Sequence, residues 1–222
     1  MASEVDICNL ALAHLGDTAT VSSINPPEGS PQAEHCQRLY PIARDSLLEM
    51  HPWGFSTKRV ALPLLATTVS QWAYVYQAPN DVLNYLAILD PAAADDYSVN
   101  FPIAYTQLGV VNTGLGMYTP QPFEVESLQD GTQVIYTNQE NALLRYTVSV
   151  ADPTTFSALF IDALSHLLAS YLAGPVIKGD VGRQESKGQY AIFQTIYARA
   201  TSSDANDRRV IVKQSTPWIA AR

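Results

Sequence analysis

Apolar side chains recur at helical spacing at the beginning of the chain and predict a short first helix. Ser3 and Asp6 have the spacing of a capping box, in which the Ser3 hydroxyl accepts a hydrogen bond from the Asp6 amide. Apolar residues then follow every three or four positions, at Val5, Cys8, Leu12 and Leu15. Gly16 stands where this helix is expected to end, because glycine adopts the left-handed conformation of a C-terminal cap without strain.

A second helix is predicted to begin at Pro31 and to end before His51. Ser30 is a typical N-cap, and proline is favoured at the first helical position because its missing N–H has no helical partner there. One side of this helix is apolar, with Ala33, Cys36, Leu39, Tyr40, Ala43, Leu47 and Met50. Pro41 lies inside the helix and is expected to kink it.

Between residues 56 and 150 the pattern changes to short stretches rich in Thr, Val and Tyr, which predicts a β-rich region. The expected strands are Ser56–Leu62, Ala73–Gln77, Val82–Ile88, Phe123–Ser127, Thr132–Thr137 and Leu143–Val150. Asp130 and Gly131 indicate a hairpin turn between two of these strands. Residues 90–122 are expected to form an excursion from the sheet.

Two further helices are predicted after residue 151. Asp152-Pro153 opens the first of them, and an apolar stripe follows: Phe156, Leu159, Phe160, Ala163, Leu164, Leu167, Leu168, Tyr171 and Leu172. Gly174-Pro175 is expected to end this helix. The last helix is expected from about Gln184 to Ala200, with its inner face formed by Phe193, Ile196, Tyr197 and Ala200.

This order of elements predicts an α+β fold. Residues 1–55 and 151–201 would form a four-helix bundle, and residues 56–150 an inserted antiparallel β-domain. Residues 202–222 would form an extended C-terminal tail.

Composition narrows the function classes. The chain has 222 residues, of which 47% are hydrophobic and only 15% charged, and its net charge is −8. It can therefore bury a core, and it lacks the basic character of a dedicated nucleic-acid-binding domain. No stretch is expected to span a bilayer, and the acidic N-terminus does not look like a signal peptide. Cys8 and Cys36 are expected to be reduced core residues.

The two ends of the chain differ in charge. Residues 183–222 have a formal charge of +4, so residues 1–182 have −12. This asymmetry suits a tail that docks on an acidic neighbour. A solvated, flexible tail is the alternative, and the apolar pair Trp218-Ile219 argues against it.

No strong catalytic signature is present. Gly-x-Ser-x-Gly, the P-loop and Gly-x-Gly-x-x-Gly are all absent. His14 diverges from Cys8 on one helix, and His35 from its neighbour Cys36, so neither a metal nor a cofactor is expected. The remaining histidines, His51 and His166, are isolated in the sequence.

One pair of acids resembles the carboxylates of a glycosidase. Glu124 and Glu126 are two positions apart on a predicted strand and therefore share a face. An exposed sheet face gives the same spacing without any chemistry. Tyrosine is also frequent, with 12 residues, and tyrosine is enriched at protein interfaces.

The chain resembles the head-to-tail adaptors of short-tailed bacteriophages, the tail tubular protein A family. The resemblance lies in the opening helix 6–17, Val21-Ser22-Ser23-Ile24, a second helix with Arg44-Asp45 and Leu47-Leu48, and the turn Trp53-Gly54-Phe55. Two later strings, residues 134–138 and Leu144-Arg145-Tyr146, resemble the family's strand pair before its C-terminal helices.

The resemblance implies a structural ring, typically of twelve copies, between the portal protein and the tail nozzle. Such a protein is made in the host cytoplasm, resides in the neck of the virion, and lets double-stranded DNA pass without specific binding and without membrane contact. The tail residues expected to bind the portal are Arg208, Arg209, Lys213, Trp218 and Ile219. Asp95 and Asp96 are the acids expected to face the DNA channel.

Two other functions remain open from the sequence. The chain is alternatively a tail-associated peptidoglycan hydrolase, with Glu124 or Glu126 as the acid. It is otherwise a bacterial scaffold or binding module unrelated to phages. The adaptor reading predicts no enzymatic activity.

Overall fold

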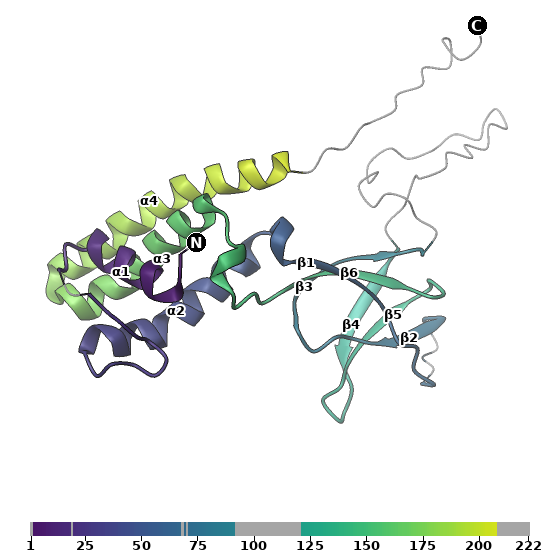
Figure 1. Ribbon diagram of the computed structural model, residues 1–222. Coiled ribbons are helices and arrows are strands. Elements are labelled where there is room, and N and C mark those ends of the chain that lie inside the picture. Colours follow the sequence, from purple (N-terminus) through teal and green to yellow (C-terminus); the bar gives the residue numbers. More distant parts are fainter. Residues whose placement is uncertain (1, 19, 68, 70, 92–120, 208–222) are drawn as a thin grey trace, which may run out of the picture.

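The computed structural model describes residues 2–18, 20–67, 69, 71–91 and 121–207, and these residues form a mixed α+β fold. Figure 1 shows the helices gathered in one half of the molecule and the strands in the other. The predicted fold class is therefore confirmed. The excursion expected at 90–122 falls outside the described residues, apart from its first two and last two positions.

The two N-terminal helices begin where their capping residues predict. Helix α1 (Glu4–His14) has the reciprocal capping box of Ser3 and Asp6, and Gly16 follows it with a φ of +74°. Helix α2 (Pro31–Met50) begins after Ser30, whose hydroxyl accepts a hydrogen bond from the Ala33 amide. Pro41 lies inside α2, which continues to Met50.

Helix α3 (Ala158–Ile177) is the central element of the helical half. It contacts α1, α2 and α4, and short 3₁₀ turns at Gly54–Ser56 (η1) and Pro153–Thr155 (η3) precede β1 and α3. Its N-cap is Ser157 rather than Asp152, which caps η3. The apolar stripe predicted on this helix includes Phe160, Leu164 and Leu168, which are fully buried.

The predicted end of the third helix is wrong. α3 passes through Gly174 and Pro175 and ends at Ile177, where Lys178 adopts a φ of +62°. Packing explains the difference, because the last turn of α3 lies against the first turn of α4. A Cβ at Gly182 would lie 2.8 Å from the carbonyl oxygen of Ala173, so only glycine allows this approach.

The predicted limits of the last helix are also wrong. α4 runs from Gly179 to Asn206, so it begins about five residues earlier than expected and includes the first five residues assigned to the extended tail. Its contact with α3 extends along the helix: Ser186 donates to the Ser170 carbonyl at 2.7 Å. Tertiary packing therefore stabilises residues whose local pattern does not favour a helix.

All six predicted strands are present, with ends that differ by up to two residues. They are β1 (Thr57–Ala61), β2 (Tyr74–Gln77), β3 (Val82–Leu89), β4 (Phe123–Ser127), β5 (Gln133–Thr137) and β6 (Leu143–Val148). They form two antiparallel sheets, ordered β1-β6-β3 and β2-β5-β4. The predicted hairpin turn joins β4 to β5, and Gly131 has a φ of +84° there.

The two sheets bury a common apolar layer. Leu144 and Ile88 come from one sheet, and Ile135 and Tyr76 from the other. Val134 and Tyr136 alternate with Ile135 along β5 and lie in a second, smaller cluster with Val75. β5 is the middle strand of its sheet, and apolar side chains thus cover it on both faces.

By length and composition alone, α3 is the one helix of the described part that is apolar enough to cross a membrane. More than half of its most apolar stretch is buried, which is typical of a core helix. The absence of a bilayer-spanning segment stays a prediction.

Candidate functional site

The residues assigned to portal binding and to the DNA channel lie outside the described residues. This applies to Arg208, Arg209, Lys213, Trp218 and Ile219, and to Asp95 and Asp96. The structure does describe the chain up to Asp207, directly after α4. The described part of the chain therefore ends at the C-cap of α4, directly before the C-terminal segment.

The end of α4 is attached to the joint between the helices and the sheets. Asp204 accepts hydrogen bonds from the Gly54 amide at 2.8 Å and from His51 Nε2 at 3.1 Å, and its side chain is only 11% exposed. About two helical turns earlier, the Tyr197 hydroxyl donates to the Met50 carbonyl at 3.0 Å. The last turns of α4 are thus held against the segment that leads from α2 to β1.

An aromatic cluster fills the interior beneath this joint. The Trp53 indole is 1% exposed and donates from Nε1 to the Leu47 carbonyl at 2.9 Å. Its ring contacts Phe160 edge to face, with centroids 5.0 Å apart, and Phe55 also packs on Phe160 at 5.1 Å. The turn Trp53-Gly54-Phe55, which carries part of the resemblance, therefore anchors α2, α3 and α4 to one another.

Within the part of the chain that the structure describes, several polar contacts join the helical half to the β half, and two of them involve α2. Asn84 on β3 donates from Nδ2 to the Glu49 carbonyl at 2.9 Å, and Ser149 donates to Asp45 Oδ1 at 2.8 Å. Asp45 also pairs with Arg44 at 3.0 Å. Both contacts involve the last two turns of α2, so α2 is the helix to which these contacts attach the β half.

Glu124 and Glu126 share one face of β4, as the two-residue period predicts. β4 is an edge strand, and both side chains are exposed. In the register of the sheet, Glu124 lies opposite Tyr136 and Glu126 opposite Val134. Burial, with Glu126 nearby, raises the pKa of the Tyr136 phenol. The geometry is that of a charged sheet edge, which also discourages pairing with other strands.

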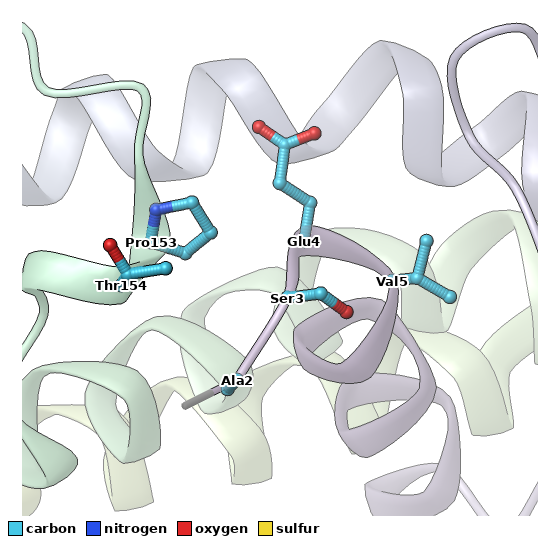
Figure 2. Close-up of a pocket in the computed structure, with 6 residues that line it drawn as sticks. All are labelled: Ala2, Ser3, Glu4, Val5, Pro153 and Thr154. Carbon is cyan, nitrogen blue, oxygen red and sulfur yellow. The ribbon is translucent and has the colours of Figure 1, made fainter.

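A shallow cavity of about 360 Å³ lies at the N-terminal end of α1 (Figure 2). Its walls come from the first turn of α1 and from η3: Ala2, Ser3, Glu4, Val5, Pro153 and Thr154. The Ser3 hydroxyl already donates to Asp6 at 2.8 Å. Glu4 is the one titratable side chain in this lining, so this cavity offers no acid–base pair.

The two cysteines are core residues, as predicted. Cys8 on α1 and Cys36 on α2 are both fully buried and unbridged. A hydrogen bond with Cys36 and the loss of solvent raise the pKa of the Cys8 thiol. Cysteines buried in apolar surroundings in this way are typically structural rather than reactive.

The sequence-based view of His166 as an isolated histidine is wrong. Its ring stacks on that of His14, with centroids 3.9 Å apart and planes 13° from parallel. His166 Nε2 also lies 3.9 Å from Asp162 Oδ1, one turn earlier on α3. His51, the other histidine considered isolated, is the partner of Asp204.

Hydrogen bonds from α4 complete this cluster. His166 Nδ1 lies 2.7 Å from Gln189 Oε1, and Gln189 Nε2 donates to the His14 carbonyl at 3.1 Å. His14 Nε2 lies 3.1 Å from the Ser165 hydroxyl. Burial and the neighbouring His166 lower the pKa of His14, while Asp162 opposes this shift. We call His14, Asp162 and His166 the histidine cluster.

Sequence reasoning missed the histidine cluster for a specific reason. The spacing of Asp162 and His166 is a local signal, since residues four apart lie on one side of a helix. His14 is remote in sequence, and only the packing of α1 on α3 brings it there. Comparisons with known proteins add no further assignment: no protein-family model matches the chain, and no curated protein matches it.

Proposed function

We propose that this chain is a structural adaptor of a short-tailed bacteriophage, which assembles as a ring between the portal protein and the tail nozzle. The observation that carries the proposal is the position of the end of α4. Asp204 holds this end at the joint between the helical half and the β half. The basic segment 208–222 follows this end directly in the sequence, and this end lies where a portal-facing part and a nozzle-facing part would meet.

The surface of the helical half suits a ring. Subunits of a ring contact one another through two different faces. Ile42 on α2 is 54% exposed, and Val181 on α4 is 70% exposed. These helices lie on different sides of α3, as Figure 1 shows. Each subunit thus offers apolar side chains on two separate faces, where neighbouring copies would cover them.

Charge supports both the docking and the passage of DNA. The body is acidic and the C-terminal segment is basic, so the segment is suited to reach an acidic neighbour. A ring of about twelve acidic copies repels phosphates, so DNA slides through without being held. Asp95 and Asp96 remain the proposed channel acids, and the virion neck remains the proposed location.

Portal binding by the basic residues of the C-terminal segment tests the proposal. We expect that replacing Arg208, Arg209 and Lys213 by alanine weakens binding to purified portal rings at least tenfold, because three charge-assisted contacts are lost. Binding is measured by surface plasmon resonance, and ring formation by negative-stain imaging of the mixture. The fold should be unchanged, because α4 ends before these residues.

A matched control removes the same charge elsewhere. Arg38, Lys187 and Arg199 are exposed on α2 and α4, and their replacement by alanine should leave portal affinity within about twofold. An equal loss of portal affinity in both triple variants would mean that binding depends on the net charge of the chain rather than on these three residues. No binding of the unaltered chain to portal rings would contradict the adaptor role itself.

A further inference from the structure

The histidine cluster has the donor set of a metal site. One nitrogen of each ring and one oxygen of the Asp162 carboxylate all lie within 4.8 Å of one another. Imidazole and carboxylate are common ligands of Zn²⁺ and of related divalent transition metals. The three side chains come from two helices, so the arrangement depends on the packing of α1 against α3 rather than on one helical turn.

Hydrogen bonds determine which nitrogen of His166 is free. Both amide hydrogens of Gln189 are used, because Nε2 donates to the His14 carbonyl and to Glu185 Oε1 at 2.8 Å. Gln189 Oε1 must therefore accept, so His166 Nδ1 carries the proton. The lone pair of His166 is then on Nε2, which is the nitrogen nearest Asp162.

The same reasoning applies to His14. The Ser165 hydroxyl donates its hydrogen to the Asp162 carbonyl at 2.8 Å, so its oxygen accepts from His14 Nε2–H. This leaves the lone pair of His14 on Nδ1. Each ring thus has one protonated nitrogen, oriented by a neighbouring side chain, and one free nitrogen. Metal-binding histidines are typically oriented in this way by groups around them.

We propose that His14, Asp162 and His166 bind one divalent transition-metal ion of the Zn²⁺ type. This proposal goes beyond the adaptor role and does not rest on it. The ion would join the C-terminal end of α1 to the middle of α3. Solvent would supply the remaining ligand from the side of Asp162, whose side chain is 47% exposed, whereas that of His166 is only 12% exposed.

Binding requires the stacked rings of His14 and His166 to turn, because one ion can accept the in-plane lone pairs of both rings only where the two ring planes meet. Two ligand atoms that each lie about 2.1 Å from a tetrahedral ion are about 3.4 Å apart. One nitrogen of each ring and one Asp162 oxygen lie within 4.8 Å of one another, so such a set would have to close by about 1.4 Å at most. The exposed Asp162 side also provides a path by which the ion can enter.

Metal titration of the untagged full-length protein tests the proposal. After treatment with EDTA and removal of the chelator, Zn²⁺ should bind at one equivalent per chain in isothermal titration calorimetry. Because the ion binds only the folded chain, the melting temperature should rise by roughly 5–10 °C at a zinc concentration about 100-fold above Kd. Co²⁺ should give the visible absorption bands of a site with nitrogen and oxygen ligands.

Single-residue variants assign the ligands. Asp162→Asn and His14→Gln should weaken Zn²⁺ binding at least tenfold, whereas His35→Gln on α2 is the matched control and should bind as the unaltered chain does. Asp162 is half exposed, so its variant is expected to fold, and circular dichroism in EDTA verifies this. Absence of stoichiometric zinc binding, or equal loss in the His35→Gln variant, would overturn the proposal.

Discussion

The helical half and the β half of the molecule build their interiors differently. In the described residues, the helices share one continuous core of 24 buried apolar side chains, centred on α3 and reinforced by aromatic contacts. The sheets bury a main cluster of 9 residues between them and a separate cluster of 3. The β half therefore has less apolar burial to draw on and relies more on strand pairing.

This difference predicts how the stability of each half changes when a core side chain is removed or when a neighbouring subunit covers it. A large side chain in the helical core touches several helices at once, so its loss weakens the whole half. A side chain between the sheets touches only two thin layers. In the proposed ring, the β half is therefore the part whose stability should increase most when neighbouring subunits cover it.

The largest expected effect is the loss of Phe160. This fully buried ring contacts Trp53, Phe55 and Phe156, so Phe160→Ala should lower the free energy of unfolding by about 3–5 kcal/mol. Urea unfolding followed by circular dichroism at the helical signal measures this. The adjacent Leu159 is 36% exposed, and Leu159→Ala should cost much less. Similar losses in the two variants would contradict the description of α3 as the centre of the core.

An intermediate effect is expected at the joint between the two halves. Asp204→Ala removes the acceptor for the Gly54 amide and for His51, which should cost about 1–2 kcal/mol. Hydrogen exchange should become faster at Gly54 and in the last turns of α4, while the strands keep their protection. Asp207→Ala, three residues later and exposed, is the control. Unchanged exchange at Gly54 would show that Asp204 does not hold the joint.

The sequence predicts most of the fold because its signals are local. Ser3, Ser30 and Gly131 mark the helix starts and the hairpin, and each contributes through its own backbone geometry. The prediction that Gly174-Pro175 ends α3 is wrong for the same reason. The pair is a strong local stop signal, but the close approach of Gly182 to α3 outweighs it.

The candidate sites are less predictable because they depend on contacts between distant residues. The joint needs Asp204 to meet Gly54, 150 positions earlier, and the histidine cluster needs His14 to meet His166, 152 positions later (166 − 14). No periodicity links such pairs. The prediction that Glu124 and Glu126 share one face is correct, in contrast, because two residues two apart on a strand need only the strand itself.

The smallest expected effect lies in the loop between α1 and α2, on the helical side of the comparison. The Ser22 hydroxyl, the Ser22 amide and the Ser30 hydroxyl donate to the exposed Glu28 carboxylate and lower its pKa below 4.5. Because the pKa is lower in the folded chain, the stabilisation is complete above about pH 4.5 and disappears as the pH falls through the folded value. The melting temperature of Glu28→Gln should therefore lie slightly below that of the unaltered chain at pH 7, and the difference should vanish once the pH has fallen below the folded-state pKa of Glu28. Glu140→Gln, exposed in the β half, should show no such difference, and a pH-independent gap for Glu28→Gln would mean that its charge plays no part.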